Sequence, residues 1–353
     1  MSIKIYLLAT AISFIASVVI IPLILTLSHR KGWYDFQDSR KIHDGNIPRL
    51  GGVGIALSFF LTCICCYCGK MIDFPSTKII VLLVSCLSIH VVGLHDDFKN
   101  LRPRYKFFWQ IVTTVFFVSC GFHFKTIIIP FSSIIICSEW VTIPITIIWI
   151  LGITNAVNLI DGLDGLSSTI AIFAALTIGL VNLVNGDGAT ALFAFAILGS
   201  VAGFLVYNKP KAKIFMGDSG SLLVGFILAA LPVLQIETGE NLVISSAITI
   251  LIIPIVDTLF AMSRRIFRGI HIATPDKEHL HHMLLDFGLS NKVILGLISL
   301  VCIAIGLIMI FVLELRSQIA FMSGALVIIW ALFFLQMYLL HRKWKKISNS
   351  NYN

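Results

Sequence analysis

The sequence predicts an all-α, polytopic membrane protein with about eleven transmembrane helices, and three observations support that prediction. Hydrophobic residues make up 58% of the 353 positions and charged residues only 12%. The mean hydropathy is +0.95. About 25% of the residues in an average soluble domain are charged, so a water-soluble fold could not cover this much apolar surface. The third observation is a repeated pattern of apolar runs about 20 residues long, which is the length of a membrane-spanning helix.

Each apolar run is expected to form one helix. The first is too long for the core of a signal peptide and has no small-residue cleavage site, so we expect it to be retained. The segment 122–139 is apolar but rich in β-branched residues and interrupted by Pro130, which favours a short hairpin or interfacial piece outside the bilayer. The eight cysteines lie mostly inside the runs and are expected to fill apolar space. The eleven predicted helices are 3–28, 51–69, 77–94, 105–121, 140–157, 165–184, 188–206, 220–236, 242–260, 293–313 and 318–340.

The basic residues predict the orientation of these helices. With the N-terminus outside, 21 of the 26 Lys and Arg residues fall on one side of the membrane, which the positive-inside rule makes the cytoplasmic side. The N-terminus is then periplasmic and the C-terminus cytoplasmic. Residues 1–340 are expected to form a single integral-membrane domain, and residues 341–353 a basic cytoplasmic tail.

The acidic residues follow the same bias, although acids contribute little to topology. Of the 18 Asp and Glu residues, 12 fall on the predicted cytoplasmic side, and most of them lie close to helix ends. An acid at the centre of a membrane helix costs roughly 2.5–3.5 kcal/mol on insertion scales, so acids near hydrocarbon need a partner or a function. Four groups of such residues predict a shared site for a metal ion and phosphate on one face.

The first group is the pair Asp96 and Asp97, at the end of the third predicted helix. Adjacent carboxylates repel each other, so a pair at a membrane border needs a cation such as Mg²⁺ or a lysine. A solvated turn after the helix is the alternative interpretation.

The second group is the run 155–166, with the sequence NAVNLIDGLDGL. Its polar residues recur every three positions and so sweep about half of a helix circumference, while its two glycines allow the backbone to break. Carboxylate and amide oxygens are ligands that suit Mg²⁺. This run is therefore expected to wrap around a bound group rather than to face solvent along one stripe.

The third group is the run 207–221, which contains Asn208, Phe215 and Asp218 directly before an apolar helix. Asp218 or Ser219 is a candidate N-cap of that helix. Alternatively, the helix N-terminus binds phosphate, and Phe215 stacks on a base.

The fourth group is the loop 264–291. Arg264, His279, His281 and His282 supply hydrogen-bond donors for a diphosphate and for sugar hydroxyls. A zinc site and an unspecialised loop are the alternatives, and zinc is disfavoured because the loop has no cysteine. Asp257 follows Pro254, which is expected to kink the ninth helix, so Asp257 is expected to be a local partner.

These motifs together resemble the polyprenyl-phosphate N-acetylhexosamine-1-phosphate transferases of glycosyltransferase family 4. The likeness runs from PRLGG at 48–52 to HLHH at 279–282, with the Asp96–Asp97 pair, NAVNLIDGLDGL and FMGDSGS in the family's order. The HLHH form is similar to the N-acetylglucosamine branch, whereas three consecutive histidines mark the peptidoglycan branch.

The resemblance implies a set of site residues. It implies that Asn158 and Asp218 hold Mg²⁺, which Mn²⁺ can replace, and that the acids Asp96, Asp97 and Asp161 are catalytic. Residues expected to contact substrate are Lys106, Gly162, Asp164, Asn208, Phe215, Arg264, His279, His281 and His282.

The resemblance also implies an activity: transfer of N-acetylglucosamine 1-phosphate from a UDP-sugar to undecaprenyl phosphate, with release of UMP, to initiate a cell-surface polysaccharide. The expected place is the bacterial inner membrane, with the active site at the cytoplasmic face. The partners are then the two substrates, membrane lipids and a second copy in a homodimer, with no nucleic acid. The alternatives are a phospho-N-acetylmuramoyl-pentapeptide translocase and, from another class, a secondary transporter, whose polar site would lie near the bilayer midplane.

Overall fold

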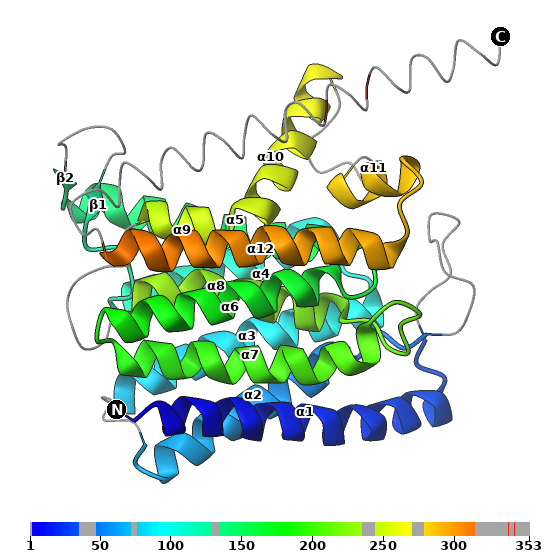
Figure 1. The fold of residues 1–353 in the computed structure, drawn as a ribbon, viewed down its shortest axis with the longest axis horizontal. Helices are drawn as coiled ribbons and strands as arrows, with labels where there is room; N and C mark the ends of the chain where they lie inside the picture. Colours follow the sequence, from blue (N-terminus) through cyan, green and yellow to red (C-terminus); the bar gives the residue numbers. More distant parts are fainter. Residues whose placement is uncertain are drawn as a thin grey trace.

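The computed structural model describes residues 2–34, 47–71, 76–128, 135–234, 244–269 and 279–314, and the single positions Tyr338 and Arg342. Its long helices run roughly side by side as a bundle, with α1, α7, α6 and α12 following one another across the face seen in Figure 1. The helices are α1 Ile3–Lys31, α2 Gly51–Cys68, α3 Ser76–Lys99, α4 Pro103–Ser119, α5 Glu139–Ile160, α6 Leu166–Val184, α7 Gly188–Asn208, α8 Gly217–Leu234, α9 Ile244–Ile250, α10 Ile252–Phe267, α11 Leu280–Asp286 and α12 Asn291–Glu314.

These elements form a polytopic helical membrane protein. In the described part of the chain, eight helices are long and apolar enough to cross a bilayer, namely α1, α2, α3, α5, α6, α7, α8 and α12. The predicted span at 105–121 corresponds to α4, which has 17 residues. The predicted span at 318–340 lies outside the described residues, as does the tail 341–353 apart from Arg342. The count of eleven spans and the orientation of the termini therefore stay predictions.

The prediction of one continuous helix over 242–260 is wrong. Residue Leu251 lies in a turn that separates α9 from α10, and α10 projects beyond the bundle (Figure 1). Pro254 has no N–H to donate to the carbonyl of Ile250, so the hydrogen-bond ladder is interrupted where the helix breaks. The expected kink is thus a one-residue turn, because the amides of Leu251 and Ile255 still donate to the carbonyls of Ala247 and Leu251.

The predicted hairpin at 122–139 is confirmed in its described part. The short strands β1 Ile127–Ile128 and β2 Ile135–Ile136 pair antiparallel, with Ile127 opposite Ile136. The hairpin lies at the end of the bundle opposite to α11 (Figure 1).

Helix α8 forms the centre of the bundle. Nearly all of its residues are buried, and it packs against α2, α3 and α5. Its first turn, beginning at Gly217, is where polar residues of the first three sequence groups converge.

Candidate functional site

Glycines let the backbones of α2, α3 and α8 touch around the first turn of α8. A methyl group at Gly52 would lie 2.1 Å from the backbone nitrogen of Gly220, and one at Gly93 would lie 2.4 Å from the carbonyl oxygen of Asp218. Only hydrogen fits at these distances. The close contact at Gly93 brings the end of α3, with its acid pair, against Asp218.

The PRLGG segment is fixed to the FMGD segment by backbone hydrogen bonds. The amide of Phe215 donates to the carbonyl of Pro48 at 2.8 Å, and the amide of Gly51 donates back to the carbonyl of Phe215 at 3.0 Å. This pairing places Arg49 over the start of α8. Its guanidinium lies 3.6 Å from the Asp218 carboxylate and 4.0 Å from that of Asp97.

Asp97 caps helix α8 from the neighbouring helix α3. Its two carboxylate oxygens accept hydrogen bonds from the backbone amides of Asp218, at 2.8 Å, and Ser219, at 3.0 Å, and its side chain is fully buried. The cap expected from Asp218 or Ser219 is thus supplied by Asp97. Both amides are bonded to Asp97 and are therefore not open to a phosphate, whereas the catalytic role expected of Asp97 stays a prediction.

Asp96 and Asp218 share the ammonium group of Lys106. The Lys106 Nζ lies 3.5 Å from the Asp96 carboxylate and is hydrogen bonded to the Asp218 carboxylate. The second oxygen of Asp96 accepts a hydrogen bond from the amide of Leu101 at 2.7 Å. Asp96, Lys106 and Asp218 therefore meet as the sequence predicted.

Asn158 reaches the same turn of α8 from α5. Its side-chain amide donates to the hydroxyl of Ser221 at 2.8 Å, and that hydroxyl donates to the carbonyl of Gly217 at 3.0 Å. These bonds account for the nitrogen of the Asn158 amide and orient its oxygen, which is the atom that a metal ion would bind.

Asp161 lies just beyond the end of α5, and the charges of Asp218 and Arg49 also act on it. Burial and the neighbouring charge of Asp218 together raise the pKa of its carboxyl to about 7, whereas the guanidinium of Arg49 acts in the opposite direction. A carboxyl with this pKa is half protonated near neutral pH, first because it is buried and second because other acids lie near it.

The residue types in this cluster fit a hard divalent cation. Among the described residues, the four carboxylates of Asp96, Asp97, Asp161 and Asp218 share two cations, Arg49 and Lys106, which leaves a formal charge of −2 when all four are ionised. Within the described residues, no three His, Cys, Asp or Glu side chains form a ready-made metal cage. Mg²⁺ is usually held by one or two protein carboxylates together with phosphate oxygens and water.

Two of the predicted substrate residues hold the loops beside the cluster. Asp164 is buried and accepts hydrogen bonds from the backbone amides of Lys211 and Ala212, both at 3.1 Å. The Asn208 oxygen accepts from the amide of Gly165 at 3.0 Å, and its nitrogen donates to the carbonyl of Ile214 at 2.9 Å. Its buried amide is thus bonded to protein through both its oxygen and its nitrogen, and the contact of Asn208 with substrate stays a prediction.

The histidine segment reaches the cluster through Gly162. Asp257 accepts hydrogen bonds from the ring of His279 at 2.8 Å and from the amide of Leu280 at 2.7 Å, so it is the local partner that the sequence predicted. A methyl group at Gly162 would lie 2.6 Å from the His281 ring. His281 is only 2% exposed, and in the described part of the chain neither ring nitrogen has a hydrogen-bond partner. Burial lowers the pKa of His281 to about 3, so the ring is neutral.

The remaining predicted residues lie around this core. His282 lies beside His281, with the ring centroids 4.3 Å apart, and Phe215 is half-buried at the start of α8. Arg264 is buried on α10 with its guanidinium 5.9 Å from the Tyr338 ring, and its substrate role stays a prediction. Arg49 also belongs to the cluster, although no site role was predicted for it. The available signal was a single arginine two residues before a helix that opens with two glycines.

Comparison with known proteins shows the family of the chain. The sequence profile of glycosyl transferase family 4 matches residues 79–236, a segment that contains the acid pair, Asn158 and Asp218. A relative from Bacillus subtilis, named probable undecaprenyl-phosphate N-acetylglucosaminyl 1-phosphate transferase, is 34% identical over 83% of this chain and 81% of its own length. The chain belongs to glycosyl transferase family 4. Within this family, a decaprenyl-phosphate N-acetylglucosaminephosphotransferase from Mycobacterium leprae is 31% identical over 87% of this chain and 84% of its own length. A phospho-N-acetylmuramoyl-pentapeptide-transferase from Listeria monocytogenes is 28% identical over 64% of this chain and 73% of its own length.

Proposed function

We propose that this protein transfers N-acetylglucosamine 1-phosphate from UDP-N-acetylglucosamine to undecaprenyl phosphate and releases UMP. The observation that carries the proposal is the junction of Asp96, Lys106 and Asp218 at the first turn of α8, beside Asn158 and Arg49. Oxygen ligands, cations and an excess of negative charge on one face suit a diphosphate bound together with a divalent cation. The names of the relatives from Bacillus subtilis and Mycobacterium leprae specify an N-acetylglucosamine phosphate group and a polyprenyl phosphate.

In the proposed reaction, an oxygen of the acceptor phosphate attacks the β-phosphorus of the donor in line. The new bond joins this oxygen to the β-phosphorus, and the bond from the β-phosphorus to the bridging oxygen breaks, so the electron pair leaves with UMP. Lys106 and Arg49 would orient the phosphates and balance their charge. Mg²⁺, held through Asn158 and Asp218, would neutralise charge on the diphosphate.

Asp96 is proposed to organise the site rather than to remove a proton. A phosphate monoester has a second pKa of about 6, so the acceptor is already largely a dianion at neutral pH. Both oxygens of Asp96 also face protein donors, Leu101 and Lys106. If this is right, Asp96→Asn reduces the rate by a similar factor at pH 6 and pH 8. A loss confined to pH 6 would restore the role of general base.

The histidine segment is proposed to contact the donor. The unpartnered nitrogens of His281, beside Gly162, are hydrogen-bonding groups that a sugar hydroxyl or a phosphate oxygen would satisfy. The distribution of Lys and Arg supports a cytoplasmic active site in the bacterial inner membrane, with the N-terminus periplasmic.

Release of UMP by the purified protein in detergent tests the proposal. We expect UMP from UDP-N-acetylglucosamine and undecaprenyl phosphate in the presence of Mg²⁺, and none from Asp218→Asn. A panel of UDP-sugars then fixes the donor. Product formed only from UDP-N-acetylmuramoyl-pentapeptide would assign the translocase reaction instead, and no UMP from any donor would contradict the proposal.

A further inference from the structure

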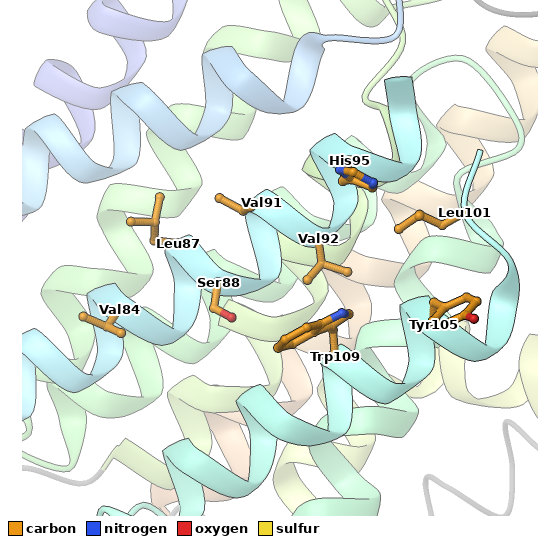
Figure 2. A pocket seen from close by; sticks show the side chains of 9 residues that line it. All are labelled: Val84, Leu87, Ser88, Val91, Val92, His95, Leu101, Tyr105 and Trp109. Carbon is orange, nitrogen blue, oxygen red and sulfur yellow. The ribbon is translucent and has the colours of Figure 1, made fainter. Parts of the chain in front are cut away.

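Helix α4 carries different side chains on two neighbouring faces. Tyr105 and Trp109 extend from α4 into the apolar pocket between α3 and α4, and Ser88 lies on the α3 wall of this pocket (Figure 2). Lys106 and Gln110 are the next residues of α4 and are four positions apart, so they share the adjacent face. Gln110 is only 1% exposed, and its amide therefore lies inside the bundle.

The side chain of Gln110 joins α4 to α5 through Asn155. The Asn155 nitrogen donates to the Gln110 oxygen at 2.7 Å and to the carbonyl of Leu151 at 2.8 Å. A backbone carbonyl only accepts hydrogen bonds, so the atom of Asn155 that faces Leu151 is the nitrogen, and the atom of Gln110 that faces this nitrogen is the oxygen. The pair therefore has one orientation, in which the nitrogen of Asn155 is bonded to protein and its oxygen is left for another partner.

Asn155 lies on the same face of α5 as Asn158, which follows it by three positions. Both side chains are partly exposed, whereas Ala156 and Val157 between them are buried. Each asparagine has its nitrogen bonded to a protein acceptor, and within the described residues no protein donor reaches the oxygen of Asn155. An amide oxygen is a hard ligand that suits Mg²⁺ or the water bound to it, so α5 presents two such oxygens on one accessible face.

The unpaired NH₂ group of Gln110 shows that this residue is not the most stable choice for its position. Its nitrogen is buried and has no hydrogen-bond partner in the part of the chain that the structure describes. A buried donor without a partner destabilises a fold. Leucine would remove this NH₂ group and would leave only one N–H of Asn155 unpaired in exchange. The contact is therefore better explained by the orientation that it gives to Asn155 than by stability.

We propose that Gln110 is a positioning residue of the metal site, which directs the oxygen of Asn155 toward the divalent cation or its bound water. The proposal rests on the proposed function, in which the acid cluster and Asn158 hold that cation. Gln110 is one helical turn from Lys106, and Asn155 is one turn from Asn158, so the bond between them joins α4 to α5 next to the cluster. Loss of this bond is expected to weaken cation binding although every oxygen ligand is still present.

The test measures binding of Mn²⁺ to the purified protein in detergent by EPR spectroscopy, which needs no substrate. Gln110→Leu is expected to raise the Kd for Mn²⁺ about tenfold, the factor that corresponds to one oriented hydrogen bond. The Mg²⁺ concentration that gives half-maximal UMP release should rise by a similar factor, whereas the melting temperature in EDTA should equal that of wild type. The matched control is Ser88→Ala, which breaks a hydrogen bond of 2.7 Å to Thr113 that joins α4 to α3 instead of α5. Ser88→Ala is expected to leave the Kd for Mn²⁺ unchanged.

A double-mutant cycle then tests whether Gln110 acts through Asn155. Asn155→Ala is expected to weaken Mn²⁺ binding at least as much as Gln110→Leu, and the double variant no more than Asn155→Ala alone. Additive losses would overturn the proposal, and so would an unchanged Kd for Mn²⁺ in Gln110→Leu or an equal loss in Ser88→Ala. If Gln110→Leu is not monodisperse in detergent, Gln110→Met replaces it under the same criteria. Wild-type protein that binds Mn²⁺ but releases no UMP would instead contradict the proposed function, so the two failures are distinguishable.

Discussion

The substitution Asp97→Asn tests whether Asp97 positions the first turn of α8 or acts on the substrate itself. The buried carboxylate accepts two backbone hydrogen bonds, at 2.8 and 3.0 Å, from the first turn of α8. Asparagine keeps one acceptor oxygen but turns an NH₂ group toward the other amide, so one charge-assisted bond is lost and a buried donor loses its partner. Each of these effects costs about 1–3 kcal/mol, so we expect a destabilisation of about 2–6 kcal/mol.

The effect on activity follows from the displacement of Asp218. A shift of about 1 Å at a catalytic group can cost 10²-fold, so kcat/KM is expected to fall about 100-fold. Stability is measured as the apparent melting temperature in detergent, and activity as UMP release. Glu139→Gln is the control, because that carboxylate is 70% exposed and is expected to leave both quantities unchanged.

The reasoning would be refuted by an Asp97→Asn protein that melts like wild type but is inactive. That result would mean that Asp97 acts on substrate and that α8 does not need its cap. A protein that is destabilised but fully active would show that the first turn of α8 does not govern catalysis.

Three other changes have defined outcomes. Gly93→Ala places a methyl group 2.4 Å from the carbonyl of Asp218 and is expected to destabilise the protein by about 1–3 kcal/mol. The control is Gly152→Ala, which has no neighbour within 4 Å and should be neutral or slightly stabilising in the same melting experiments. The raised pKa of Asp161 gives wild-type protein stability that is present at acid pH and lost as the pH rises through about 7. Between pH 5 and pH 8 in EDTA, the free energy of unfolding of Asp161→Asn should therefore gain about 1–2 kcal/mol relative to that of wild type. Equal pH dependence of stability in the two proteins would contradict the raised pKa of Asp161. Removal of divalent cations with EDTA should abolish UMP release and added Mg²⁺ should restore it, and activity that persists in EDTA would exclude the metal site at Asp218.

Much of the fold was predictable because apolar runs of about 20 residues form membrane-spanning helices in a bilayer. The break at Leu251 was not predicted as a break, since Pro254 within an apolar run is compatible with either a kink or two separate helices. The choice depends on what α10 packs against, and that information lies outside the local sequence.

The sequence predicted which polar residues gather at the site, but not which protein groups each of them bonds to. Asp96 and Asp97 are adjacent and chemically identical, yet one pairs with Lys106 and the other caps α8. Asn208 looked equally available, but its amide holds Gly165 and Ile214. Only the three-dimensional packing of α3 against α8, set by glycine contacts, decides which polar group faces a ligand.

The cap supplied by Asp97 also has a consequence for biosynthesis. Its donors, the amides of Asp218 and Ser219, lie more than a hundred positions later in the chain. Asp97 is therefore synthesised well before the helix that it stabilises. Until α8 has inserted, no partial product contains the assembled centre. Any nascent or truncated form that ends before this helix is therefore expected to be inert, however many of its spans have entered the membrane.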